Sequence, residues 1–568
     1  MIRRLATLCA FALLAASALA QSRPETIAPA LAVHAKNGMV VAQEQSAARI
    51  GADILARGGN AVDAAVAVGF AMAVSYPRAG NIGGGGFMVI HLTASNEDVA
   101  VDYRETAPAA ATPTMFLGAN GEPDPNKSRD SVLAIGVPGT VSGLALAEAK
   151  YGSGKFSLAD LIAPAIDLAE KGLPVDDDTA DSLPSSRDRF ARYPASSAIF
   201  LKDGGKVLGP GDRLVQTDLA ETLKLIAHDG PVGFYQGETA RKFAAAVQAA
   251  GGLITQDDLK NYHAVIRTPV RGSYRGYDIV SMPPPSSGGI ALIEMLNIIE
   301  GYDLGGAGRI DALHLMIEAM KRAYADRAVF LGDPEAVNVP LKGLISKRYA
   351  AALRGRIGDR ATPAAETRAG DPATYEGANT THFSVIDRDG NAVSNTYTLN
   401  FSYGLGMIAA GTGILLNNEL DDFTAKAGAS NAYGLIGFEA NLPGPGKRPL
   451  SSMSPTVVLK GGKPVLITGS PGGSRIITAV LQVIVNALDF HLPIDGAVSA
   501  PRLHDQWLPD AVLVEPGFDP AILEALAARG HKIVPTLPGT SANSIAVTAD
   551  GYVGAADTRT RGALAVGY

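Results

Sequence analysis

The chain has 568 residues, 47% hydrophobic and 18% charged, so it can bury a large core and exceeds the usual size of a single domain. Its formal net charge of −7 gives no electrostatic basis for binding nucleic acid or an anionic membrane surface. With one cysteine, it can form neither an internal disulfide nor a cysteine-based metal site.

The first 20 residues have the pattern of a secretory signal peptide. Arg3 and Arg4 precede an apolar run, residues 5–16, and Ala18-Leu19-Ala20 supplies the small residues that a signal peptidase reads. The run is shorter than the roughly 20 residues that a membrane span needs. We therefore expect cleavage after Ala20 and a periplasmic or secreted protein without a membrane span.

Helical and strand patterns follow one another along the rest of the chain. Apolar residues at helical spacing predict helices at 47–57, 61–74, 141–151, 158–171, 238–250, 289–300, 310–330 and 475–488. Apolar or alternating runs predict strands at 87–90, 381–387, 392–399, 457–460, 465–468, 545–548 and 552–555. Asp389-Gly390 and Asp550-Gly551 are hairpin signals. Helices combined with antiparallel hairpins favour a layered α+β fold.

Residues 355–379 are the most linker-like stretch, because they are polar and contain Pro363 and Pro372 but few large apolar side chains. Chain length alone would suggest that two domains meet there.

Familiar catalytic motifs are absent from the sequence. It contains no Walker A sequence and no G-x-S-x-G elbow, and its nine histidines show no paired spacing of a zinc site. The GxGxxA string at 404–409 lacks a preceding strand of a βαβ unit and is interpreted as a turn. We expect neither a metal nor a cofactor.

The remaining candidate chemistry lies at Asn379-Thr380-Thr381, where the linker-like stretch meets the predicted hairpin. Spacing alone would make this an ordinary threonine-rich strand start. Ordered motifs change that interpretation: GNAVDAA at 59–65, GGGGF at 83–87, DYRETAP at 102–108, VPG at 137–139, YTLN at 397–400, GILLNNELDDF at 413–423, PLSSMSPT at 449–456 and GSPGGSR at 469–475. Together they resemble the γ-glutamyltranspeptidase (glutathione hydrolase) family of N-terminal-nucleophile hydrolases, over nearly the whole mature chain.

The resemblance implies a four-layer αββα sandwich and a proenzyme that cuts itself between Asn379 and Thr380. A large subunit, residues 21–379, and a small catalytic subunit, residues 380–568, would then form one unit. Thr380 would carry both a nucleophilic Oγ and a free α-amine, whose pKa of about 8 suits a general base near neutral pH. Thr381 is the rival nucleophile by adjacency, but the family motif places the nucleophile first.

The roles of the other site residues also follow from the resemblance. Thr398 would orient the nucleophile, and the backbone N–H groups of Gly472 and Gly473 would bind the oxyanion. A γ-glutamyl group carries an α-carboxylate and an α-ammonium. The implied carboxylate ligands are Arg104, Ser451 and Ser452, and the implied ammonium ligands are Asn400, Glu419 and Asp422. Many family members have Gln at the position of Glu419, and either side chain can accept from an ammonium.

Residues 425–447 would form a lid with Tyr433 near Asn400, which favours glutathione-like donors over cephalosporin side chains. The implied reaction is ping-pong acyl transfer, in which Thr380 takes the γ-glutamyl group from glutathione or another γ-glutamyl amide and passes it to water, an amino acid or a dipeptide. Two alternatives stay open: a cephalosporin or glutaryl acylase of the same fold, and an uncleaved, inactive periplasmic binding protein.

Overall fold

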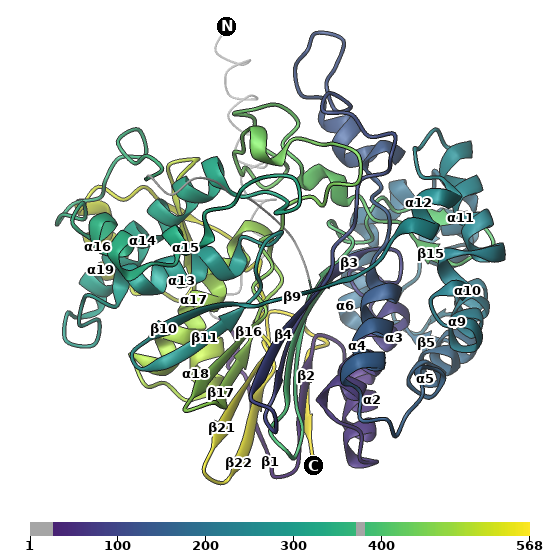
Figure 1. Ribbon diagram of the computed structural model, residues 1–568, viewed down its shortest axis with the longest axis horizontal. Coiled ribbons are helices and arrows are strands. Elements are labelled where there is room, and N and C mark those ends of the chain that lie inside the picture. Colours follow the sequence, from purple (N-terminus) through teal and green to yellow (C-terminus); the bar gives the residue numbers. More distant parts are fainter. Residues whose placement is uncertain (1–26, 371–380) are drawn as a thin grey trace, which may run out of the picture.

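The computed structural model describes residues 27–370 and 381–568 (Figure 1). The expected signal peptide and both residues of the expected cut, Asn379 and Thr380, lie outside the described residues. Within the described ranges, no helix combines the length and the apolar character needed to cross a membrane.

Two seven-stranded sheets, antiparallel throughout, form the middle of the molecule. In spatial order, the first sheet contains β1 (Ala32–Ala35), β22 (Gly551–Ala555), β21 (Ser544–Thr548), β17 (Lys463–Thr468), β16 (Thr456–Lys460), β11 (Tyr277–Ser281) and β10 (Val270–Tyr274). The second contains β23 (Leu564–Gly567), β2 (Met39–Ala42), β12 (Thr381–Ile386), β13 (Ala392–Thr398), β3 (Gly85–Leu92), β4 (Glu97–Tyr103) and β9 (Val265–Arg267).

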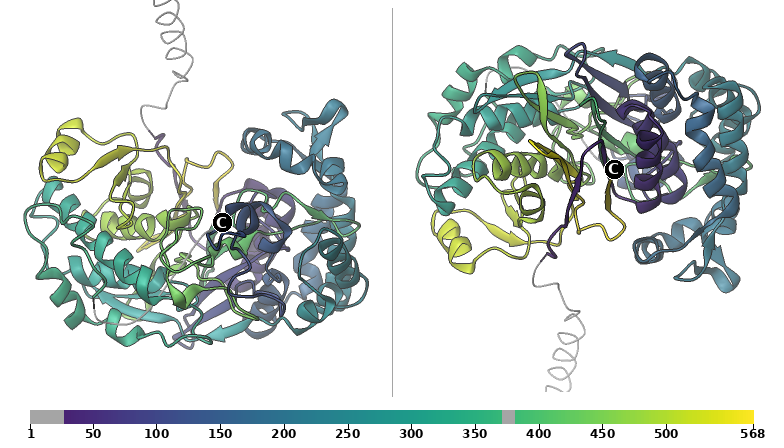
Figure 2. Two further views of the ribbon diagram at one scale, coloured as in Figure 1. Left: turned by 90° about the horizontal axis from the view of Figure 1, so that it is seen from above. Right: turned by 90° about the horizontal axis from the view of Figure 1, so that it is seen from below.

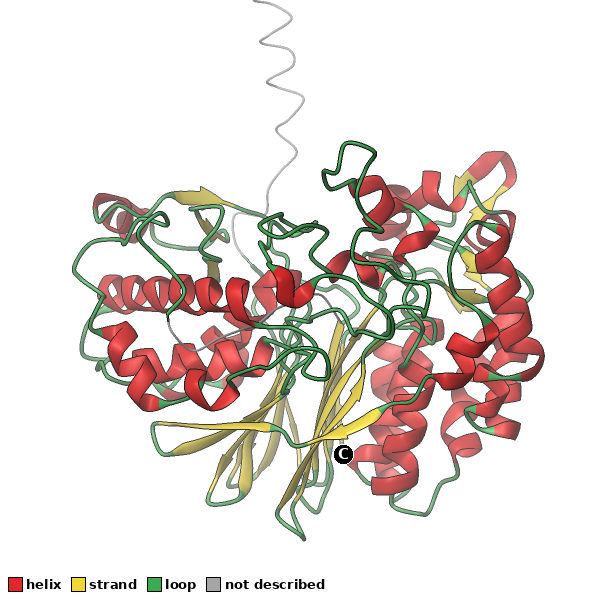
Figure 3. Ribbon diagram, turned by 45° about the horizontal axis from the view of Figure 1, so that its top comes forward, coloured by secondary structure: helices red, strands yellow, loops and turns green. Residues whose placement is uncertain are grey.

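Helices cover the outer face of each sheet (Figures 2 and 3). Those on the second sheet's side are α2 (Gln45–Ala56), α3 (Ala61–Ser75), α4 (Thr140–Tyr151), α5 (Leu158–Lys171), α9 (Thr217–Asp229), α10 (Val232–Tyr235), α11 (Gly237–Ala249) and α12 (Gln256–Asn261). Those on the first sheet's side are α13 (Gly288–Ile299), α14 (Arg309–Phe330), α15 (Leu341–Leu344), α16 (Lys347–Arg354), α17 (Ile476–Leu488), α18 (Ile494–Ser499) and α19 (Pro520–Ala528).

Smaller elements surround this frame. They are α6 (Asp177–Ser182), α7 (Arg187–Phe190), α8 (Pro194–Phe200), β5 (Leu173–Pro174), β6 (Leu201–Lys202), β7 (Lys206–Val207), β8 (Arg213–Leu214), β14 (Ile408–Ala409), β15 (Ile414–Leu415), β18 (Leu503–His504), β19 (Val512–Val514) and β20 (Ile533–Pro535).

Strand β3 shows why the sequence produces these layers. Phe87 and Val89 belong to the apolar core between the two sheets, whereas Met88 and Ile90 belong to the core under α2, α3 and α4. Successive side chains of a strand point to opposite faces, so a continuous apolar run is buried on both sides. The layers are therefore helix, sheet, sheet, helix, and the predicted four-layer sandwich is confirmed.

The sheets show that residues 355–379 do not separate two domains. Strands β2, β3, β4 and β9 come from before that stretch, and β12, β13 and β23 from after it, yet all seven belong to one sheet. The stretch therefore joins two halves of a single sandwich.

Candidate active site

A cavity of about 740 Å³ lies where strands β12 and β13 meet the start of α17. Among its lining residues are Thr381, Thr398, Asn400, Tyr433 and the glycine pair at 472–473. Thr381 begins β12 and pairs in register with Tyr397 of β13, so the start of one strand lies beside the end of its neighbour. Five residues expected in the site thus share one cavity with Thr381, which follows Thr380 in the chain. They are Thr398, Asn400, Tyr433, Gly472 and Gly473.

Thr398 and Asn400 are held by a tight turn at the end of β13. The Thr398 Oγ1 accepts from the backbone N–H of Asn400 at 2.8 Å, and Asn400 adopts a left-handed φ of 73°. The Asn81 Nδ2 donates to the Thr398 carbonyl at 2.7 Å. Asparagine tolerates this backbone region better than most residues, so the turn fixes both side chains at the cavity.

Gly472 and Gly473 precede α17, with left-handed φ values of 131° and 67°. A Cβ on Gly472 would lie 2.6 Å from the Gly539 carbonyl oxygen, so no other residue fits without displacing backbone. The positive end of the α17 dipole favours a developing negative charge at this position.

Arg104 lies outside the cavity lining, in a fully buried cluster of charges. Its Nη1 donates to Glu419 at 2.5 Å and its Nη2 to Asp422 at 2.6 Å. These carboxylates take the N–H groups that the family resemblance assigns to the substrate's α-carboxylate. One hydrogen bond links the cavity to the cluster: Asn400, which lines the cavity, donates through its Nδ2 to the carbonyl of Asn418, the residue before Glu419.

The electrostatics of this cluster follow from burial and from its excess of carboxylates. Burial raises the pKa of Asp422 to about 6, with Arg104 opposing the shift. Burial and then Glu105 raise the pKa of Glu419 well above its ordinary value, and burial raises that of Glu105 to about 8. Burial alone would lower the pKa of Arg104, but Glu419, Asp422 and Glu105 hold it above its ordinary value.

Ser451 and Ser452 are fully buried beside this cluster. Arg104 donates to the carbonyl oxygens of Pro449 and Leu450, immediately before them. The Ser451 Oγ accepts from the N–H of Met453, and the Ser452 Oγ accepts from the Arg327 Nη2 at 3.1 Å. The buried Arg327 is a second cation at this position that the sequence analysis did not identify.

Tyr433 lies in the predicted lid and lines the cavity. Its hydroxyl donates to the Asn400 Oδ1 at 2.9 Å, and its ring packs edge-on against Phe401 at 5.7 Å. The expected closeness of Tyr433 and Asn400 is present.

Comparisons with known proteins identify the family. The family model described as gamma-glutamyltranspeptidase matches residues 47–567. The chain belongs to the γ-glutamyltranspeptidase family. A glutathione hydrolase proenzyme of Escherichia coli (strain K12) is 51% identical, covering 94% of this chain and 93% of that protein. An acylase ACY 1 proenzyme of Pseudomonas sp. (strain SE83) is 41% identical, covering 92% of each. The crystal structure of a cephalosporin acylase from Bacillus halodurans superposes with a TM-score of 0.85 at 29% identity, covering 96% of this chain and 98% of that chain.

Gln43 and His382 lie at the described start of strand β12, where Thr381 is the first residue. The Thr381 Oγ1 donates to the Gln43 Oε1, so its hydroxyl is engaged in the structure. His382 is fully buried, its ring nitrogens contact Thr396 and Ser384, and burial lowers its pKa to about 3. A neutral imidazole with both ring nitrogens in such contacts and a lowered pKa is a weak base, so His382 is unsuited to general-base catalysis. Gln43 carries no sequence signal that would have identified it.

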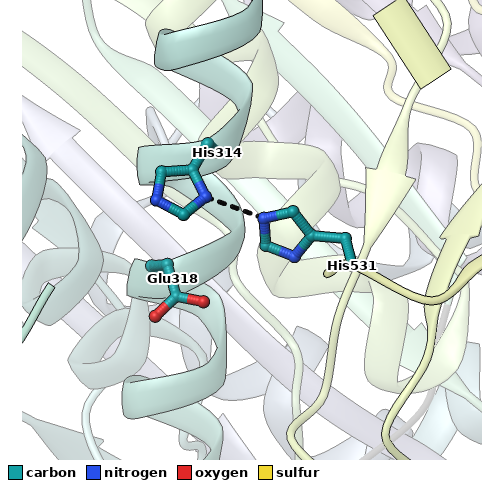
Figure 4. A group of neighbouring side chains, drawn as sticks. All are labelled: His314, Glu318 and His531. Atoms are coloured by element: carbon teal, nitrogen blue, oxygen red, sulfur yellow. Dashed lines mark hydrogen bonds between the residues drawn. The ribbon is translucent and has the colours of Figure 1, made fainter. Parts of the chain in front are cut away.

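Figure 4 shows a second group that sequence spacing missed: His314 and Glu318 of α14 with His531, whose potential ligand atoms lie within 4.8 Å of one another. The His314 Nδ1 hydrogen-bonds to the His531 Nε2 at 2.8 Å, and its Nε2 to the Gly358 carbonyl at 2.8 Å. Glu318 accepts from Arg322 at 2.6 Å and has Lys321 at 3.5 Å. The two nearby cations oppose a bound metal cation, and hydrogen bonds already engage both His314 nitrogens, the His531 Nε2 and Glu318, so the group forms a hydrogen-bond network.

Proposed function

We propose that this chain is a γ-glutamyltransferase and glutathione hydrolase whose nucleophile is Thr380. The observation that carries the proposal is the cavity at the start of β12, which Thr398, Asn400, Gly472 and Gly473 line together. Family membership and the similarity to glutathione hydrolase proenzymes support the same activity.

The precursor first cuts itself between Asn379 and Thr380. The Thr380 Oγ attacks the Asn379 carbonyl carbon, the peptide C–N bond breaks and the acyl group moves from N to O. Water then hydrolyses the ester, releasing the Asn379 carboxylate and leaving Thr380 with a hydroxyl and a free α-amine. The products are a large subunit, residues 21–379, and a small subunit, residues 380–568.

The mature enzyme uses the same hydroxyl for acyl transfer. The α-amine takes the Oγ proton as Oγ attacks the γ-carbonyl of the donor, and Gly472 and Gly473 stabilise the oxyanion. The proton passes to the leaving amine, for example cysteinylglycine from glutathione. Water then releases glutamate, or an amino acid or dipeptide takes the γ-glutamyl group.

Donor binding exchanges internal charge pairs for external ones. The donor's α-carboxylate replaces one of the two carboxylates on Arg104, with Ser451 and Ser452 alongside. The donor's α-ammonium pairs with the displaced carboxylate, Glu419 or Asp422, and donates to Asn400. A zwitterion supplies both charges at once, so neither internal group is left buried and unpaired. A donor lacking either charge would leave one uncompensated.

The N-terminal pattern supports export through a signal peptide cut after Ala20, and hence action in the periplasm or outside the cell. Glutathione and other γ-glutamyl compounds would be met there as substrates. No nucleic acid partner is proposed.

A second candidate, a cephalosporin or glutaryl acylase, is favoured by the similarity to proteins named as acylases. The deciding experiment compares kcat/KM of the processed protein on a γ-glutamyl anilide and on glutaryl-7-aminocephalosporanic acid. We expect strong preference for the anilide, because the glutaryl group lacks the α-ammonium. Preference for the cephalosporin would contradict the proposal. The exposed Thr548→Ala variant should match the unmodified protein, whereas Thr380→Ala should be inactive on both.

A further inference from the structure

Residues 356–370, the last described residues before the expected cut, lie along helix α14. We call them the tail segment. One face of α14 binds this segment through polar side chains that recur at helical spacing: His314, Glu318, Lys321, Arg322 and Asp326. His314 contacts the Gly358 carbonyl at 2.8 Å, Lys321 donates to the Thr362 carbonyl at 3.0 Å, Arg322 donates to the Arg356 carbonyl at 2.8 Å, and Asp326 accepts from the Gly370 N–H at 2.5 Å.

Thr362 makes the densest contacts in the tail segment. Its N–H and Oγ1 donate to the two carboxylate oxygens of Glu318, at 3.0 and 2.6 Å, and its Oγ1 accepts from the Arg322 Nη2 at 3.2 Å. Glu318 is fully buried, so these bonds are sheltered from water. A polar, linker-like sequence is therefore fixed in place by hydrogen bonds, in addition to the apolar contacts of Ile357 and Ala369 with the core.

The opposite side of the tail segment contacts residues that follow the expected cut. The Trp507 Nε1 donates to the carbonyl oxygens of Ala364 and Thr367, both at 3.1 Å, and the Ala361 N–H donates to the Arg529 carbonyl at 2.8 Å. Ala364 and Thr367 are buried. After processing, the tail segment would belong to the large subunit and Trp507 to the small one.

Trp507 is adjacent to a residue of the cavity. Gln506 lines the cavity, and its Nε2 donates to the Tyr433 carbonyl at 3.1 Å. The Tyr433 hydroxyl in turn donates to Asn400. The chain from Thr362 to Ala364, the Trp507 hydrogen bond and the contact of the adjacent Gln506 with Tyr433 therefore connect the tail segment to the lid.

We propose that the tail segment stays docked after processing and braces the lid, holding Tyr433 over the cavity through Trp507 and Gln506. The inference rests on the proposed function, since the lid matters only if the cavity binds the donor. Thr362 and Trp507 are thereby positioning residues: they act through Gln506 and Tyr433 and do not contact the donor. The large subunit's new C-terminal region would be part of what closes the active site.

Trp507 is the only tryptophan in the chain, so its fluorescence emission reports on docking of the tail segment. The test variant is Thr362→Val, which keeps the branched shape and removes the hydroxyl. We expect a red-shifted emission maximum and a roughly 3- to 10-fold lower kcat/KM for a γ-glutamyl anilide through a higher KM, with kcat changed less than about twofold. The control is Glu366→Gln in the same segment, an exposed site where emission and kinetics should not change. Complete processing of each variant is checked first on a denaturing gel.

Unchanged emission in Thr362→Val would show that the hydroxyl does not dock the tail segment. Shifted emission with an unchanged KM would show that docking does not brace the lid. Either result overturns the inference. If the unmodified protein does not turn over the anilide, the proposed function fails, while emission still tests docking by itself. If Thr362→Val does not fold, Trp507→Phe removes the Nε1 donor and keeps an aromatic ring. It should raise KM in the same way, and an unchanged KM would count against the brace.

Discussion

The Tyr433 hydroxyl donates a hydrogen bond to the Asn400 Oδ1 at 2.9 Å, and this contact joins the lid to the end of strand β13. The Asn400 backbone N–H donates to the Thr398 Oγ1, and the Asn400 Nδ2 donates to the carbonyl of Asn418, which precedes Glu419. Asn400 therefore connects the proposed lid, Thr398 and the buried charge cluster.

Replacing Tyr433 with Phe should loosen the lid without altering the chemistry. One hydrogen bond of about 0.5–1.5 kcal/mol is lost, so KM for a γ-glutamyl donor should rise roughly 2- to 10-fold, with kcat little changed. Steady-state kinetics on a γ-glutamyl anilide measure this. The control Tyr277→Phe, on a strand of the first sheet, should behave as the unmodified enzyme. A fall in kcat with constant KM would mean that Tyr433 serves the chemical step instead.

Gly472→Ala should reduce catalysis strongly. The new Cβ would lie 2.6 Å from both the Gly539 oxygen and the Thr540 Cγ2, at a φ of 131° that alanine avoids, so the N–H groups aimed at the oxyanion must move. We expect kcat to fall roughly tenfold or more. Gly209→Ala is the matched control, because an added Cβ there meets nothing within 4 Å. Normal kcat in Gly472→Ala would exclude the assigned role.

Arg104→Gln should destabilise the fold as well as abolish donor binding. It leaves Glu419 and Asp422 buried without their cation, a loss of about 3–5 kcal/mol for a broken buried pair. Because burial raises both pKa values, the carboxyls protonate readily and the loss should be smaller at pH 5 than at pH 8. Urea unfolding at both pH values measures it. The control Arg57→Gln breaks an exposed pair with Asp53 and should change the free energy of unfolding little at either pH. Equal losses of stability for Arg104→Gln at pH 5 and pH 8 would contradict this explanation.

The pH dependence of kcat/KM should show two ionisations on its acid side. The α-amine of Thr380, with a pKa of about 8, must be neutral to accept a proton. Asp422, whose pKa burial raises to about 6, loses the charge that binds the donor's ammonium as the pH falls below that value. The logarithm of kcat/KM should therefore fall with a slope near 1 below pH 8, approaching 2 below pH 6. Asp422→Asn should be less active, and its slope should stay near 1 below pH 6. A slope near 2 below pH 6 in this variant would assign the second ionisation to another group.

Local patterns predicted the main elements of the fold well. Helix α3 begins at Ala61 as expected, because Asn60 and Asp63 form a capping box, and α5 matches its prediction at both ends. Helix α2 begins two residues earlier than predicted, because the Glu44 side chain accepts from the N–H groups of Ser46 and Ala47. Helix α9 was missed, although its Leu219, Leu223 and Ile226 have helical spacing.

Contacts between distant segments could not be predicted in this way. Strand β2 pairs with β23 at the opposite end of the chain, and no local pattern encodes such a partner. The motifs suggested that Arg104, Glu419 and Asp422 lie together, but not that they pair with one another before a donor arrives. The composition of residues 355–370 is typical of a linker. It does not show that these residues form hydrogen bonds with α14 and Trp507, far away in the sequence.

Intact mass spectrometry of the purified protein tests the central claim most directly. We predict two chains, the smaller with the mass of residues 380–568 and Thr380 as its first residue, and a single uncut chain for Thr380→Ala. A single chain in the unmodified protein, a small chain that begins at Thr381, or normal cutting of Thr380→Ala would contradict it.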